Sequence, residues 1–210
     1  TFVGYERMEC EAAVKAVIKG NELADSVAEG EEAYLVLDVT PFYAESGGQV
    51  GDIGTITAEG AVFEVANTVK SPSGVSICIG VQKEGELSVG QNVRAQVDRD
   101  TRLATMRNHT AAHLLQAALR RVLGTHVEQA GQLVDSRRMR FDFTHFSALT
   151  GEELRAVEDL VNQWILDGME ADIREMPIDE ARRLGAMALF GEKYGDVVRV
   201  VRMGDVSMEL

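Results

Sequence analysis

The first half of the chain alternates hydrophobic and polar residues in short runs. Alternation with a period of two places the apolar side chains on one face of a β-strand. The clearest runs cover residues 14–18, 34–39 and 75–79. Turn signals rich in glycine separate such runs about every ten residues. This spacing predicts a small closed β-barrel. A helix over residues 9–19 is the alternative for the first run, since Glu11-Ala12-Ala13 favours helix.

The periodicity changes near Asp98. Residues 101–123 approach a 3.6-residue period, which predicts a helix capped by Asp98 or Asp100 and stopped by Gly124. The residues assigned to its repeating face are Leu103, Met106, Thr110, His113, Leu114, Ala117 and Leu123.

Shorter elements follow this helix. A strand pair is predicted at 131–134 and 139–143, and a capping box at 150–153 opens a helix through about residue 166. A short helix from 176 to about 185 and strands over 197–203 and 205–210 complete the pattern. The predicted fold class is therefore α+β, with a small β-barrel over residues 1–98 and an α+β core over residues 99–210.

The charge is acidic and uneven. The net charge is −13 over 210 residues, of which −10 falls on residues 1–100 and −3 on residues 101–210. A nucleic-acid binder normally shows a basic face, so these totals argue against this chain gripping a polyanion by itself. Thirteen of the fourteen cations in the second half are arginines, which suit local phosphate contacts.

The number of cysteines and the length of the apolar runs indicate the cellular compartment. Two cysteines, Cys10 and Cys78, do not make a disulfide framework, so a reduced, cytoplasmic protein is expected. No run approaches the roughly 18 apolar residues of a membrane span, and no export signal opens the chain. Because the first residue is Thr1 and the last residues resemble an interrupted strand, we expect a piece of a longer polypeptide.

His109 and His113 are the strongest candidates for chemistry. Imidazoles four residues apart share one face of a helix and can offer two nitrogens to one metal ion. Thr110 and Ala111, which follow the first histidine, cannot act as the general base of a zinc protease. Two structural histidines on an amphipathic helix are the alternative. His126 and His145 are candidates for further ligands, although each sits in a turn-like context that also fits an ordinary histidine.

Two further stretches are unusual. The glycine-rich segment 42–54 lacks the lysine and the following helix of a phosphate-binding loop. A tight hairpin with positive φ at its glycines is therefore the favoured interpretation. Gln129 both donates and accepts hydrogen bonds, so near a metal it can orient an ester carbonyl or a water. A turn residue facing solvent is the alternative for Gln129.

Four blocks of the sequence together resemble the editing region of the alanyl-tRNA synthetase family, in the family's order and spacing. These blocks are Thr40–Asp52, Asn108–Leu115, Arg140–Phe146 and Ala186–Gly195. The resemblance implies a barrel like that of translation elongation factors, followed by an α+β editing core shared with threonyl-tRNA synthetase. It also implies hydrolysis of serine or glycine wrongly esterified to tRNA(Ala).

The resemblance implies roles for particular residues. His109 and His113 match two of four zinc ligands, and the other two belong to a Cys-x-x-x-His segment that in the family follows a run like the one ending at Leu210. Gln129 matches an editing-pocket position that recognises the amino acid or positions water. Thr110 would contact the substrate through its hydroxyl or pack the helix. Zinc would either activate a water or anchor the substrate.

The resemblance also implies partners. They are the acceptor end of tRNA(Ala) and its mischarged seryl or glycyl ester, and no membrane is expected. ATP and Mg²⁺ belong to an aminoacylation domain that precedes this piece. Oligomerisation of the parent is expected to use a C-terminal region outside this chain. Two alternatives stay open: a free-standing deacylase acting in trans, and a non-catalytic module that positions tRNA.

Overall fold

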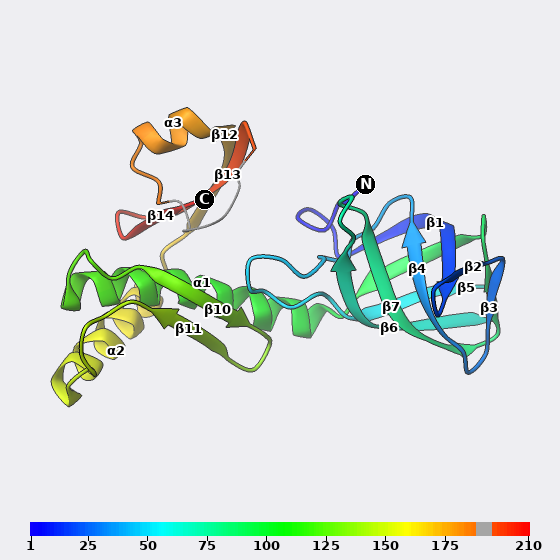
Figure 1. Ribbon diagram of the computed structural model, residues 1–210, viewed down its shortest axis with the longest axis horizontal. Coiled ribbons are helices and arrows are strands. Elements are labelled where there is room, and N and C mark those ends of the chain that lie inside the picture. The colour runs from blue at the N-terminus through cyan, green and yellow to red at the C-terminus, as the bar shows by residue number, and fades with distance from the viewer. Residues whose placement is uncertain (188–194) are drawn as a thin grey trace. The chain divides into compact units, whose positions relative to one another are not determined.

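The computed structural model describes residues 1–187 and 195–210 (Figure 1). It divides into two compact units. The first contains residues Thr1–Met106 and Leu133–Arg138, and the second contains Arg107–Gln132 and Met139–Leu210. The sequence boundary near residue 98 stays a prediction, because helix α1 (Arg99–Leu123) runs through the end of the first unit.

A closed, antiparallel ring of six strands forms the first unit. In spatial order these strands are β1 (Glu9–Lys19), β4 (Glu32–Leu37), β7 (Ser76–Glu84), β6 (Ala61–Lys70), β5 (Gly54–Ala58) and β9 (Asn92–Val97). The ring closes because β1 is long enough to pair with two neighbouring strands. Its residues 9–13 pair with β9, and residues 14–18 pair with β4. The predicted barrel is confirmed, and the alternative helix over residues 9–19 is wrong.

The side chains that fill the barrel come from every second residue of its strands. In β4 and β9 every second residue is buried, so one face of each strand points to the interior of the barrel. The enclosed core is mostly aliphatic, with two phenylalanines, Phe42 and Phe63, among its fully buried side chains. Three short strands lie outside the ring. β2 (Glu22–Ala24) pairs antiparallel with the end of β1, and β3 (Ser26–Ala28) pairs with β8 (Glu86–Ser88).

The second unit combines helices with two small sheets. Its elements are the later part of α1, β10 (Gln129–Val134) up to Gln132, its hairpin partner β11 (Met139–Phe143), α2 (Gly151–Leu166), β12 (Ala171–Pro177), α3 (Ile178–Arg183), β13 (Val197–Met203) and β14 (Ser207–Glu209). The α+β class is therefore confirmed. Thr150 caps α2 with the predicted capping box, since its hydroxyl accepts from Glu153 N–H and Glu153 accepts from Thr150 N–H.

Strand β12 corrects the sequence analysis, which expected only a short helix starting at residue 176. The strand is almost entirely exposed, so no alternation of buried and exposed positions marks it. Its existence depends on backbone pairing with β13 from Ala171–Met203 to Pro177–Val197. Pro177 ends the strand and α3 begins at Ile178, where proline is tolerated because no further ladder donor is needed.

The sheet β12–β13–β14 separates two clusters of the second unit. Val201 and Met203 of β13 pack in a cluster with Leu114, Leu119 and other residues of α1 and α2. Val198 and Val200 pack instead with Ala181 of α3. Because neighbours along a strand point to opposite faces, residues paired with Val201 and Met203 lie on the α1 side. The register assigns Ser207 and Glu209 of β14 to that side.

Helix α1 departs from its expected face. Asp98 caps it as predicted, accepting from Thr101 N–H at 2.8 Å, and Gly124 ends it with φ 118°. However, Met106 is 49% exposed and Thr110 is exposed, whereas the polar Arg102 and Gln116 are buried. The predicted face is not buried along the whole helix, because the residues up to Met106 belong to one compact unit and the rest of α1 belongs to the other. Among residues 1–187 and 195–210, no helix is long and apolar enough to cross a membrane.

Candidate functional site

His109 and His113 lie together on α1, as their spacing predicts. Their rings stack nearly parallel, with centroids 5.1 Å apart and planes 9° apart. Burial, the charge of His113 and the charge of Arg199 lower the pKa of His109 to about 4, opposed by Glu209. His109 is therefore a neutral imidazole near pH 7, which is the state that binds metals.

A buried carboxylate meets His113. Glu209 Oε2 lies 2.5 Å from His113 Nδ1, and the Glu209 side chain is only 4% exposed. The hydroxyl of Ser207 donates to the other oxygen, Oε1, at 2.9 Å. Glu209 was missed in the sequence because it closes a short tail strand. The signal was a carboxylate two residues after a serine in an otherwise apolar run, which the strand period places on one face.

The two histidines fit half of a zinc site. A ligating histidine commonly donates its other ring N–H to a carboxylate, and His113 has that partner in Glu209. Neutral His109 also fits a metal ligand. A structural zinc site needs four ligands and a catalytic one needs three. Within the part of the chain that the structure describes, no group of three or more His, Cys, Asp or Glu side chains is placed to hold a metal.

His126 and His145 pair with each other. Their nitrogens Nε2 and Nδ1 are 2.8 Å apart, and the ring of Phe146 stacks on His126 and contacts His145 at a tilt. This pair joins the turn after α1 to the end of β11. Within the described residues, this pair belongs to no group of three or more metal-binding side chains.

The roles predicted for Gln129 and Thr110 stay predictions. Gln129 is the first residue of β10 and is half-buried. Thr110 is an exposed residue of α1. Part of the fourth family block, residues 188–194, lies outside the described residues.

The glycine-rich segment is a hairpin, as predicted. Ser46 and Gln49 exchange backbone hydrogen bonds, and the two central residues, Gly47 and Gly48, have φ of 58° and 79°. Two positive φ values are the signature of a type I′ turn, which glycine adopts without strain. Gly51 is needed for another reason: a Cβ there would lie 2.0 Å from Thr68 O.

A buried ion pair fixes the base of this hairpin. Asp52 accepts from Tyr43 N–H at 2.6 Å and from Arg102 Nε at 2.9 Å. The Arg102 guanidinium also donates to the carbonyls of Gly4 and Pro41. Arg102 and Asp52 are 5% and 6% exposed. No local pattern indicates this pair, because its members are 50 residues apart.

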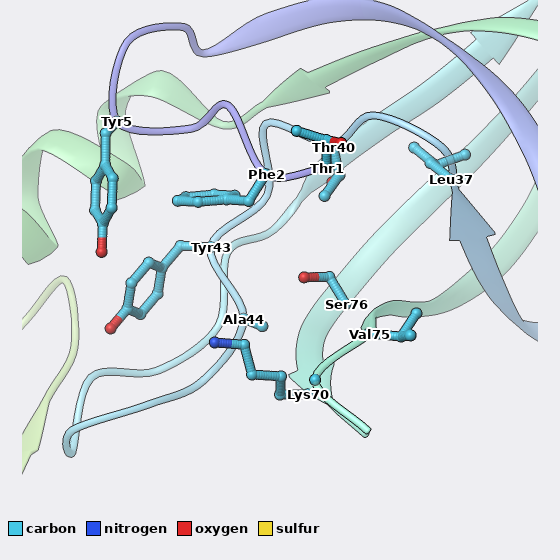
Figure 2. Close-up of a pocket in the computed structure, with 11 residues that line it drawn as sticks. Thr1, Phe2, Tyr5, Leu37, Thr40, Tyr43, Ala44, Lys70, Val75 and Ser76 are labelled. Carbon is cyan, nitrogen blue, oxygen red and sulfur yellow. The ribbon is translucent and has the colours of Figure 1, made fainter. Parts of the chain in front are cut away.

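A pocket of about 470 Å³ opens in the first unit (Figure 2). The rings of Phe2, Tyr5 and Tyr43 line one side, where Phe2 packs edge-on against both tyrosines. Lys70 and Ser76 lie across from them. None of the predicted site residues lines this pocket, so the chemistry of the histidines lies elsewhere.

Comparison with known proteins first defines a class. Residues 1–101 match the family model of class II (A) tRNA synthetases. Over essentially its whole length the chain is 56% identical to the alanine–tRNA ligase of Acetivibrio thermocellus. The identity is 51% with the enzyme of Clostridioides difficile and 50% with that of Bacillus cereus. The chain thus belongs to the alanine–tRNA ligase family, and it spans 24% of the length of these relatives.

Proposed function

We propose that this chain is the editing segment of an alanine–tRNA ligase and hydrolyses seryl and glycyl esters of tRNA(Ala). The observation that carries the proposal is the pair His109 and His113 on one face of α1. His109 is a neutral imidazole, and the ring of His113 contacts the buried carboxylate of Glu209. A pocket built for alanine cannot strongly reject glycine or serine, so the parent needs a second, hydrolytic sieve.

The proposal assigns His109 and His113 to a zinc ion, with further ligands from a Cys-x-x-x-His segment following Leu210. Bound zinc supplies Lewis-acid polarisation of a water or of the ester. His109 binds as a neutral imidazole, so it loses no proton near pH 7. Gln129 would orient the amino acid or a water by its amide, and Thr110 would offer its hydroxyl to the substrate. Arg199, whose charge acts on His109, would attract RNA phosphate.

The proposal extends to the whole polypeptide. The longer protein would join alanine to tRNA(Ala) with ATP and Mg²⁺ in another domain, in the cytoplasm, and would oligomerise through a region outside this chain. The net charge of −13 fits a segment that receives the acceptor end from such a protein rather than gripping tRNA by itself.

The test measures deacylation of seryl-tRNA(Ala) by this chain and by a longer polypeptide that includes the Cys-x-x-x-His segment, with bound zinc quantified in both. We expect hydrolysis and zinc in the longer form, and loss of both on His109→Ala or His113→Ala. The matched control is His126→Ala, which removes a histidine of the other pair and should leave both unchanged. Unchanged hydrolysis in the His109 and His113 variants would contradict the metal assignment.

A non-catalytic tRNA-positioning module is the second candidate. One observation favours it: the described residues include no group of three metal-binding side chains. Tight binding of tRNA(Ala) by the longer polypeptide without any ester hydrolysis would support this second function.

A further inference from the structure

Glu209 is a buried carboxylate without a cation of Lys or Arg among its hydrogen-bond partners in the described chain. Burying a carboxylate is costly unless both oxygens are satisfied. Here both are: Ser207 donates to one oxygen, and His113 Nδ1 lies against the other. A glutamate buried at this position of β14 therefore points to a role on His113.

The backbone around Glu209 is held on both sides. Glu209 pairs with Val201 of β13 and forms a parallel bridge with Met187. Met187 N–H donates to Met208 O, and Leu210 N–H donates to Met187 O. Because the carboxylate sits on a fixed strand and its second oxygen is tied to Ser207, it presents Oε2 to the ring in one orientation.

We propose that Glu209 is a positioning residue that sets the tautomer of His113. An ionised carboxylate only accepts hydrogen bonds, so the ring nitrogen facing it, Nδ1, carries the proton. Nε2 then keeps its lone pair and is the nitrogen that His113 offers beside His109. The zinc consequence of this inference rests on the proposed function, whereas the tautomer does not.

The first experiment reads the tautomer without any metal. We would record long-range ¹H–¹⁵N spectra of the histidine rings of the metal-free chain at pH 8. We expect a ring proton of His113 on Nδ1, the nitrogen that faces Glu209. In Glu209→Met, which keeps the length and removes the acceptor, we expect the Nε2–H tautomer to gain population. A wild-type proton on Nε2, or the same tautomer in both proteins, would overturn the inference.

Two controls separate this role from a structural one. Glu209→Gln keeps an acceptor oxygen and should retain the Nδ1–H tautomer better than Glu209→Met. The rings of His126 and His145, which contact each other, serve as internal references and should not change. A backbone spectrum that stays native in the variants shows that the tautomer shift is not due to unfolding.

The second experiment titrates Zn²⁺ alone against a competing chelator, using the longer polypeptide with the Cys-x-x-x-His segment. Removing a carboxylate partner of a ligating histidine typically weakens metal affinity about 10–100-fold, and we expect that loss in Glu209→Met. Equal affinities would overturn the metal role of Glu209. Absence of zinc binding by the wild type would contradict the proposed function instead, and the tautomer result would still decide the inference.

Discussion

At the scale of single residues, the described part of the chain buries charged side chains in two places and satisfies each in a different way. Glu209 is held by a hydroxyl and an imidazole, and Asp52 by the guanidinium of Arg102 and the N–H of Tyr43. Buried ion pairs contribute little net stability compared with apolar side chains, but removing one partner leaves a charge without compensation. Each of these residues is therefore sensitive to substitution.

Arg102→Met is expected to lower the free energy of unfolding by about 3–5 kcal/mol, because Asp52 would remain buried without its cation. The carbonyls of Gly4 and Pro41 would also lose their donor. Urea unfolding followed by circular dichroism measures the change.

The matched control for that prediction is Arg94→Met. Arg94 pairs with Glu9 at 2.7 Å, but the two side chains are 54% and 51% exposed. An exposed pair contributes about 0–1 kcal/mol, so this variant should unfold nearly as the wild type does. Losses of the same size in both variants would show that burial of the Arg102 pair is not what makes it important.

At the scale of elements, capping determines where α1 starts. Asp98 accepts from Thr101 N–H and its carbonyl accepts from Arg102 N–H. The backbone N–H of Thr101 lowers the pKa of Asp98, because it favours the ionised form. The charge also lies at the positive end of the helix dipole.

Asp98→Ala should destabilise the protein by about 1 kcal/mol at pH 7. The folded pKa is lowered, so the contribution of the charge is present above the ordinary aspartate pKa of about 4 and is lost as pH falls through the folded value. Melting temperatures of wild type and variant should therefore converge when pH is lowered from 7 to 3. Asp98→Asn is the control, since asparagine also caps helices. A difference that stays constant with pH would show that the carboxylate charge is not involved.

Most helices and strands could be predicted from the periodicity of hydrophobic residues. The alternating runs at 14–18, 34–39 and 75–79 mark strands, because one face of β1, β4 and β7 is buried in the barrel. The strand at 171–177 could not be predicted, because exposed edge residues carry no such pattern and only pairing with β13 defines it. The pairing partner is chosen by the fold and not by the local sequence.

At the scale of the whole molecule, compact units and sequence periodicity divide the chain at different places. The hydrophobic pattern changes near Asp98, whereas the first compact unit extends to Met106. The extra residues include Arg102, which provides the cation for Asp52. The start of α1 is thus part of the packing of the barrel unit.

This division can be tested with two fragments. We expect a fragment of residues 1–106 to resist urea better than residues 1–98, by about 3–5 kcal/mol, because the shorter one leaves Asp52 buried and unpaired. Arg102→Met in the longer fragment is the control and should remove its advantage. Equal urea midpoints for the two fragments would place the boundary of the folded barrel unit at residue 98, as the sequence pattern predicts.

The sequence by itself determined the strands with one buried face, the helix carrying His109 and His113, the α+β class and the family, because burial on one face leaves a periodic record and long motifs are specific. Only the tertiary structure decided that Glu209 meets His113, that His126 meets His145 and that Arg102 meets Asp52. These partners lie 96, 19 and 50 residues apart. Contacts between side chains so distant depend on strand register and packing, which no local pattern encodes.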